Sequence, residues 1–509
     1  MINKILDKVG SGGVWLAALS CTACFPALGS LASALGLGFL SHFEGIAVNT
    51  LLPLFASLAL LVNFYNWYQH RDSLRGVLSV IGPIAVLLTL YPLWQYDWST
   101  YLFYFGIIWM VVMSILDIVK PITKYAVLLK DKNMIKYELE KMLYYAKEGR
   151  QGPVLMDLPD DLQRADINPK NLKSFVPPKK SKKKVSFENK FLNLIKKSKR
   201  PLIVVGHGVN LSNTKKELYK FISKTGIPFS PSWATVDLFS SEDKMNAGTF
   251  GVAATRYGNF AIQNSDLIIS LGCRLNTQIT GSNLKSFAPR AKKIVVDIDN
   301  NEFKKMNGLK YDLKINLDLK EFFKKINPKI NSSKNYNVWI NKFKLWKEKY
   351  PVVQEKYYRQ SRKCNPYVFF RSLSELTGKN DVLIPDASAN LIWAMQSFKI
   401  KGQKVFTALN HSPMGYSMPA TIGAYLANKS KNVICTIGDG SMQMNIQELA
   451  TISHFNFPIK IFVINNNGYG LIKQTQDTWL DSRRVGVDSG SGLGMPNLIK
   501  IANAYGIKT

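Results

Sequence analysis

The chain has 509 residues, and its 66 Lys and Arg against 35 Asp and Glu give a formal net charge of +31; this length allows about three domains. The lysines are scattered through the downstream segments without interleaved aromatic motifs, which argues against nucleic-acid binding and is typical of solvated surface charge. Five cysteines in so long a chain exclude a disulfide framework and suit a reducing compartment.

Residues 1–119 carry only four basic and five acidic side chains, so the positive charge lies downstream. Four uncharged runs in this region, 13–40, 45–69, 76–96 and 98–116, are each long enough for a membrane-spanning helix of about 20 residues. Basic residues lie before the first run, between the second and third, and after the fourth. By the positive-inside rule, the N-terminus and everything after residue 119 then lie in the cytoplasm. We therefore expect a four-helix, multi-pass transmembrane bundle in the inner membrane.

Cys21 and Cys24 lie three residues apart in the first run, hence on one face of a helix. Paired thiolates select soft metals, although two cysteines can equally act as small apolar residues between packed helices. The stretch CTACFPALGSLASALGLGFLSHFEG and the four-run layout resemble the MerC mercury-transport family over nearly all of residues 1–119. The resemblance implies that Cys21 and Cys24 bind a mercuric ion. Residues 117–123 contain none of the further cysteines expected there.

Residues 120–176 have the pattern of a βα fragment. Apolar residues follow a helical period over 135–146, Gly149 ends that helix, and 153–158 is strand-like. Two stretches of sequence here are ITKYAVLLKD and YELEKMLYYAKEGRQGPVLMDLPDD. They resemble the end of the pyrimidine-binding domain of acetolactate-synthase-like enzymes, which use thiamine diphosphate. The resemblance implies that the earlier part of that domain, with the glutamate that activates the cofactor, is missing because membrane sequence occupies its place.

The next segments are a lysine-rich linker (177–187), a central α/β domain (188–330) and a connecting segment (331–365) that carries an amphipathic helix over 335–362. The linker is expected to be solvated, or alternatively to contact anionic lipid. Strands are expected over three apolar runs of the central domain: 202–205, 267–271 and 293–298.

The central domain contains the motifs GHGVNLS, LGCRLNTQITGSN and IVVDID. They resemble the central domain of acetolactate synthases. Many of these hold FAD there, with an arginine for which Arg274 is the candidate, while related enzymes keep the domain without the flavin.

The last domain, 366–509, contains two turns that resemble parts of a thiamine-diphosphate cradle. A turn at 386–390 follows the strand 382–384, and the resemblance makes Asn390 a donor to the diphosphate. In HSPMGYSMPATIG, Met414 matches the residue that props the cofactor in its bent form. On composition alone Met414 would be a core methionine.

Two further turns follow neighbouring parallel strands, at 432–437 and 459–464, which a helix over 445–455 connects. Their polar and glycine residues are Gly438, Asp439, Gly440 and Ser441 in the first turn, and Asn466 and Gly468 in the second. Parallel strands deliver such turns to the ligand-binding edge of a sheet. Hard oxygen ligands there suit Mg²⁺ bound to a diphosphate. The GDG and NN spacing resembles the thiamine-diphosphate motif, with Asp439, Asn466 and Gly468 as metal ligands; two ordinary βα turns are the alternative.

Two functions from different classes follow. The first is a membrane-tethered thiamine-diphosphate enzyme of acetolactate-synthase type, acting on an α-keto acid such as pyruvate. The identity of the acceptor substrate is left open, because Thr475 stands at a position where these enzymes usually have tryptophan. We expect little activity from the chain alone, because Glu138, Glu140 and Glu148 fall on or just after a helix rather than at a strand end. The resemblance implies a homodimer, or pairing with a complete homologous subunit.

The second function is transport of mercuric ion by a protein whose cytoplasmic part is inactive. A third interpretation is a join of two unrelated coding sequences near residues 117–121, where the two resemblances meet without a linker. The last domain is also expected to end short of its final strands at Thr509.

Overall fold

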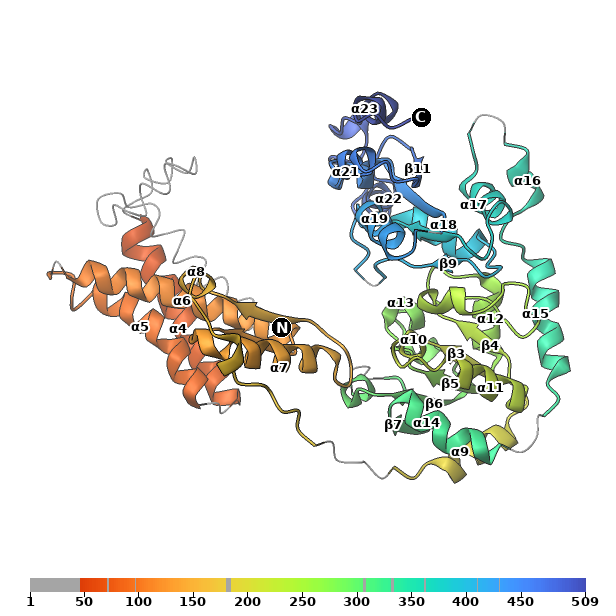
Figure 1. Cartoon of the computed structure of the whole chain (residues 1–509), viewed down its shortest axis with the longest axis horizontal. Coiled ribbons are helices and arrows are strands. Elements are labelled where there is room, and N and C mark those ends of the chain that lie inside the picture. Colours follow the sequence, from red (N-terminus) through yellow and green to blue (C-terminus); the bar gives the residue numbers. More distant parts are fainter. Residues whose placement is uncertain are drawn as a thin grey trace. The chain divides into compact units, whose positions relative to one another are not determined.

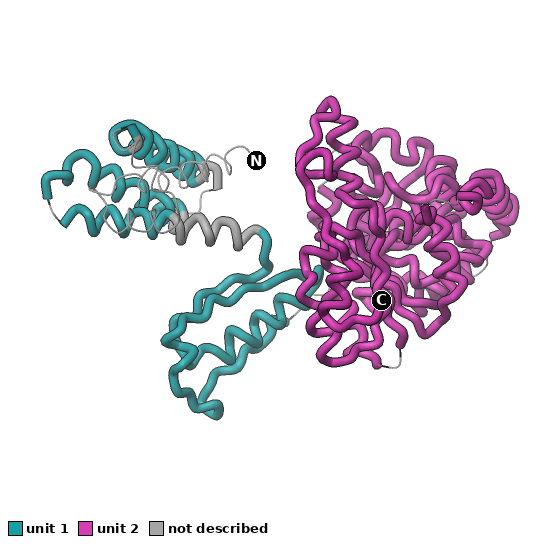
Figure 2. Tube along the Cα trace, turned by 90° about the horizontal axis from the view of Figure 1, so that it is seen from above, with its two compact units in different colours: residues 1–180 teal, residues 181–509 magenta. Residues whose placement is uncertain are grey.

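The computed structural model describes residues 46–70, 73–96, 98–179, 185–304, 308–330, 334–360, 363–409, 411–429 and 431–509. The chain divides into two compact units, residues 1–180 and 181–509, which are coloured separately in Figure 2. The first predicted membrane run, with Cys21 and Cys24, lies outside the described residues.

Three helices occupy the other predicted membrane runs (Figure 1). They are α4 (Leu52–His70), preceded by a π-helical turn, η2 (Ala47–Leu51), then α5 (Ser73–Leu90) and α6 (Ser99–Ile122). The helices α5 and α6 approach closely at two glycines, because a Cβ on Gly82 would lie 3.0 Å from the carbonyl oxygen of Gly106. Over the described residues, one stretch, Val48–Tyr65, is long and apolar enough to cross a membrane, and two apolar helices, Gly76–Leu90 and Ser99–Met110, are shorter.

The rest of the first unit is a small βαβ motif. Strand β1 (Tyr125–Leu128) pairs in parallel with β2 (Val154–Asp157), and α7 (Ile135–Lys147) connects them after a short 3₁₀ turn, η3 (Lys132–Met134). A short helix, α8 (Asp160–Gln163), and a 3₁₀ turn, η4 (Pro169–Asn171), follow. Gly149 ends the α7 region with a φ of +56°, as the sequence predicts. Strand β1 was missed, because its residues were not distinguished from the apolar sequence that precedes them.

The central domain is a parallel sheet with the order β4-β3-β5-β6-β7. Its strands are β3 (Pro201–Val205), β4 (Phe229–Pro231), β5 (Leu267–Leu271), β6 (Lys292–Asp297) and β7 (Leu313–Asn316). The helices of this domain are α9 (Glu188–Lys197), α10 (Gly208–Leu211), α11 (Lys215–Thr225), α12 (Arg256–Asn264), α13 (Thr277–Thr280) and α14 (Leu319–Ile326). The prediction of β3, β5 and β6 is confirmed. The short strands β4 and β7 lie at the two edges and were missed.

The last domain is a second parallel sheet, with the order β11-β10-β8-β9. The strands are β8 (Val382–Pro385), β9 (Lys404–Val405), β10 (Val433–Gly438) and β11 (Lys460–Ile464). Its helices are α17 (Pro366–Glu375), α18 (Ser388–Ser397), α19 (Ser417–Ala427), α20 (Asp439–Met444), α21 (Glu448–His454), α22 (Gly470–Trp479) and α23 (Leu498–Ala504). The chain adds β9 on one side of β8 and β10 on the other. The carboxyl ends of β8 and β10 therefore form a topological switch point, where open α/β sheets bind ligands.

Two predicted helices are wrong in extent. The helix expected over 445–455 is the shorter α21, and the separate helix α20, which begins directly at Asp439, was not predicted; between the two, Asn445 leaves the helical conformation with a φ of −137°. The helix expected over 335–362 ends as α15 (Asn337–Lys349), and only the short α16 (Glu355–Tyr358) follows. Pro351 explains this end, since the residue before a proline avoids the helical conformation.

Candidate cofactor site

Asp439 lies where β10 meets α20, and its side chain is only 2% exposed. One carboxylate oxygen, Oδ2, accepts hydrogen bonds from the backbone N–H groups of Asn466 and Gly468, both at 3.2 Å. The other, Oδ1, accepts from the N–H of Gly440 at 2.9 Å. These three backbone donors fix the orientation of the carboxylate. The structure thus brings together the two turns that were predicted from separate strands.

The Asn466 side chain faces two further oxygen atoms. With its amide oxygen turned inward, that atom lies 2.8 Å from the Gly468 carbonyl oxygen and 3.1 Å from Oδ1 of Asp439. With the amide turned over, the nitrogen donates a hydrogen bond to each of these oxygens. Three oxygens at these separations repel one another unless a proton or a cation lies between them. The first orientation offers the three hard ligands that a divalent cation takes, and the second satisfies the same atoms when no cation is bound.

Two glycines in these turns are required by their neighbours. A Cβ on Gly440 would come within 2.2 Å of the Tyr469 ring, and one on Gly468 would lie 2.3 Å from the Val487 carbonyl oxygen. Val487 is buried, and its carbonyl accepts a hydrogen bond from the N–H of Tyr469 at 3.0 Å. Tyr469 and Val487 therefore complete the wall of the site. Sequence reasoning missed both, because Val487 lies in a segment without periodicity.

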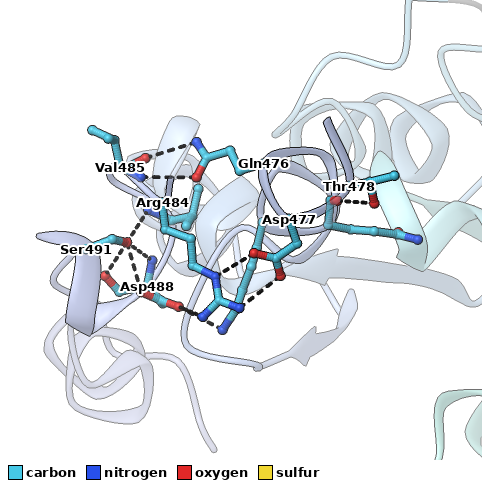
Figure 3. A network of polar contacts seen from close by, with 10 residues as sticks. Gln476, Asp477, Thr478, Arg484, Val485, Asp488 and Ser491 are labelled. Carbon is cyan, nitrogen blue, oxygen red and sulfur yellow. Dashed lines mark hydrogen bonds and ion pairs between the residues drawn. The ribbon is translucent and has the colours of Figure 1, made fainter. Parts of the chain in front are cut away.

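The segment that carries Val487 is held by a polar network with α22 (Figure 3). Arg484 donates two hydrogen bonds to Asp477, at 2.7 and 2.9 Å, and Lys473 pairs with Asp488 at 2.7 Å. These hydrogen bonds lower the pKa values of Asp477 and Asp488, so both carboxylates stay ionised at neutral pH. The network fastens this irregular loop to α22, the helix that follows the turn at Asn466 and Gly468.

Met414 lies in the turn before α19 and is half-buried rather than a core residue. The next residue, Gly415, donates its N–H to Asp386 Oδ1 at 3.1 Å, and its carbonyl accepts a hydrogen bond from Asn445 Nδ2 at 2.9 Å. Asp386 belongs to the predicted turn after β8. The sequence identified this turn but gave no role to Asp386 or Asn445.

Asn390 is buried, and its Nδ2 donates to the Thr436 carbonyl oxygen at 2.7 Å. One of its two N–H groups is thus already used within the protein, and its Oδ1 is buried without a partner.

Ser441 is buried in α20. Cys435 is a core residue as predicted, and burial raises the pKa of its thiol to about 12, so it stays protonated.

A second cavity, of about 870 Å³, is lined by the carboxyl-end turns of β3 and β5 and by residues of the last domain. Arg274 lines it and forms an ion pair with Glu302, Nε to Oε1, at 3.3 Å. Trp233 also lines it, and its Nε1 is buried without a hydrogen-bond partner. The cavity size suits a cofactor-sized ligand. The sequence identified Arg274 but not the contribution of Trp233.

Comparison with known proteins matches three separate regions of the chain to family models. Residues 7–119 match the MerC mercury resistance protein, 189–326 the central domain of thiamine pyrophosphate enzymes, and 386–509 the C-terminal TPP binding domain of these enzymes.

Individual relatives agree with the two downstream matches. The large subunit of acetolactate synthase from Cyanidium caldarium is 31% identical over 407 residues, which is 78% of this chain and 68% of the relative. A chloroplastic acetolactate synthase from Nicotiana tabacum is 29% identical over 77% of this chain and 60% of the relative. One from Brassica napus is 30% identical over 77% of this chain and 61% of the relative.

Proposed function

The chain belongs to the acetolactate-synthase family of thiamine-diphosphate enzymes and carries a MerC-like N-terminal region, and we propose that it is a membrane-tethered protein that binds thiamine diphosphate through Mg²⁺. The observation that carries this proposal is the convergence of the Asp439 carboxylate, the Asn466 side-chain amide and the Gly468 carbonyl oxygen at one edge of the sheet. The calorimetric titration described at the end of the Discussion tests it.

The proposed domain boundaries follow the sequence, with a membrane domain, a remnant of the pyrimidine-binding domain, a linker, a central domain, a connecting segment and the diphosphate-binding domain. In that order they are 1–119, 120–176, 177–187, 188–330, 331–365 and 366–509.

The donor set supports Mg²⁺ as the ion. Mg²⁺ is commonly held by one or two carboxylates together with phosphate oxygens and water. Among the described residues, no group of three His, Cys, Asp or Glu side chains could hold a metal alone. The ion would therefore take Asp439, Asn466 and the Gly468 carbonyl from the protein, and its other ligands from the diphosphate and water. Gly438, Gly440, Ser441 and Asn390 line the same cradle.

We propose decarboxylation and carboligation of an α-keto acid such as pyruvate as the chemistry of the soluble part. Bound thiamine diphosphate supplies the nucleophilic carbon and the electron sink for this reaction. The protein's own residues would orient the cofactor, with Asp439 and Asn466 holding the diphosphate through the ion and Met414 contacting the thiamine rings. Thr475, on α22, donates its hydroxyl to the Leu471 carbonyl at 2.9 Å. It supplies no aromatic surface for an acceptor, so the proposal leaves the acceptor substrate open.

A multi-pass arrangement in the inner membrane, with the soluble part in the cytoplasm, is part of the proposal. It is supported by large apolar side chains exposed along the helices of the first unit, among them Leu61 on α4, Ile84 on α5 and Ile108 on α6. Aromatic side chains gather around the α5–α6 connection, namely Tyr91, Trp94, Tyr96, Trp98 and Tyr101. Such aromatic groups are enriched at membrane–water interfaces.

Transport of mercuric ion is a second candidate function, because the matched MerC region contains the Cys21/Cys24 pair. Vesicles that contain the full chain should take up mercuric ion, and Cys21→Ser or Cys24→Ser should abolish the uptake, since two thiolates bind a soft ion far better than one. Radiometric uptake measures this, with Cys364→Ser in the soluble part as the matched control. Unchanged uptake in both single variants would leave the pair as packing residues.

FAD is the proposed occupant of the 870 Å³ cavity. Its lining offers an arginine, an unpartnered indole N–H and apolar surface, which fit a flavin nucleotide chemically. Titration with FAD should quench flavin fluorescence, and Arg274→Ala should weaken binding about tenfold, as expected for loss of a charge-assisted hydrogen bond. Arg290→Ala, an exposed arginine outside the cavity lining, is the control. Equal binding by both variants would remove Arg274 from the site.

A further inference from the structure

Asp386 is a fully buried carboxylate at the end of β8. Its Oδ1 accepts the N–H of Gly415 at 3.1 Å, and its Oδ2 accepts the N–H of Ser417 at 2.9 Å. Burial of a charge is costly unless hydrogen bonds compensate for the lost water. Both oxygens of this carboxylate are used on one short stretch of backbone, the turn that presents Met414.

Asn445 holds the same turn from another element. It follows α20, the helix that begins at Asp439, and its Nδ2 donates to the Gly415 carbonyl at 2.9 Å. Gly415 has a φ of +86°, and a Cβ there would lie 2.9 Å from the Asn445 amide nitrogen. The N–H and C=O of one glycine are therefore fixed by side chains from two junctions, Asp386 between β8 and α18 and Asn445 between α20 and α21.

We propose that Asp386 and Asn445 are positioning residues that fix the Met414 turn relative to the metal–diphosphate site, and so set the affinity for the ring half of thiamine diphosphate. This inference rests on the proposed function of the site. It assigns the two residues no contact with the cofactor. They act on the ligand only through the backbone of Gly415 and its neighbours. Substituting them should therefore weaken the contacts to the rings of thiamine diphosphate and leave the contacts to its diphosphate unchanged.

The hydrogen bonds from Asp386 and Asn445 to this turn are called the clamp below. Two substitutions that leave the side-chain size unchanged test it. Asp386→Asn leaves an acceptor at only one of the two positions, so one backbone N–H faces an NH₂ group. Asn445→Asp replaces the donor that faces the Gly415 carbonyl by an acceptor. A buried polar group left without its partner costs about ten- to hundredfold in the equilibrium that depends on it.

The experiment is isothermal titration of the full chain in detergent micelles with Mg²⁺, using two ligands. Thiamine diphosphate reports on the whole cradle, and inorganic pyrophosphate reports on the metal–diphosphate half alone. Both variants should bind thiamine diphosphate about ten- to hundredfold more weakly and pyrophosphate with unchanged affinity. Their double variant should lose less than the sum of the single losses, because both act on one glycine.

Asp381→Asn is the matched control. Asp381 precedes the opposite end of β8 and accepts hydrogen bonds from the Gly378 N–H and from Asn432 Nδ2, both at 2.8 Å. This variant should bind both ligands as the unaltered chain does.

Three results would overturn the inference. Unchanged affinity for thiamine diphosphate in Asp386→Asn and Asn445→Asp would show that the clamp does not matter. Equal losses for both ligands would show general destabilisation of the domain. Failure of the unaltered chain to bind either ligand would remove the proposed function itself, and with it this inference.

Discussion

The purified 509-residue chain should consume pyruvate about a hundred- to ten-thousandfold more slowly than a complete acetolactate synthase, which is the contribution of general acid–base catalysis. In this enzyme class, by the resemblance, a glutamate from the pyrimidine domain of one subunit serves a cofactor held by its partner. The three candidate carboxylates after the membrane region are held locally. Glu138 accepts a hydrogen bond from the Tyr125 hydroxyl at 2.7 Å, Glu140 from the Phe175 N–H at 2.7 Å, and Glu148 from the Tyr144 hydroxyl at 2.6 Å.

Complementation separates a missing glutamate from a defective cradle. The chain is mixed with a complete acetolactate synthase subunit whose own GDG aspartate is changed to alanine, and pyruvate consumption is measured for each component and for the mixture. Activity that appears only in the mixture would show that residues 366–509 form a usable half-site. Robust turnover by the chain alone would contradict this account of the pyrimidine domain.

Asp439→Ala should weaken binding of thiamine diphosphate by more than about a hundredfold, since loss of even the outer partners of metal ligands costs about 10–100-fold. The substitution removes a proposed ligand and also the acceptor of three backbone N–H groups. Calorimetry of the full chain with Mg²⁺ measures the loss.

Met414→Ala is the comparison for this change. It removes contact with the ring half but no metal ligand, so its loss should be smaller. A loss from Asp439→Ala no larger than that from Met414→Ala would refute the assignment of Asp439 to the ion.

The strands that position the cofactor site were predictable because they are short, mainly apolar runs. β10 (VICTIG) and β11 (KIFVI) are rich in β-branched residues, and the GDG and NN turns lie at their carboxyl ends. Parallel pairing of β10 with β11 then brings the two turns together. The edge strand β9, with two residues, was too short to give a periodic signal.

The parts of the site that could not be predicted depend on contacts between distant segments. The Asp386 and Asn445 clamp on Gly415 joins residues 29 and 30 positions apart, and neither residue belongs to a recognisable motif by itself. The same holds for Val487, whose carbonyl excludes a side chain at Gly468. Helix α20 was missed because its six residues begin within the GDG turn, which was predicted as a turn.

The membrane region was predicted from composition alone. Three of its runs are helices, and α6 continues to Ile122 through the stretch where the two family resemblances meet. The four-helix bundle stays a prediction, because the first run lies outside the described residues.

The most direct test of the account is calorimetric titration of thiamine diphosphate into the full chain, in detergent, with Mg²⁺ and then with a chelator. The account predicts saturable one-site binding with Mg²⁺ and none with the chelator, because Asp439, Asn466 and Gly468 would hold the diphosphate only through the ion. Equal affinity in both titrations, or no binding in either, would contradict it.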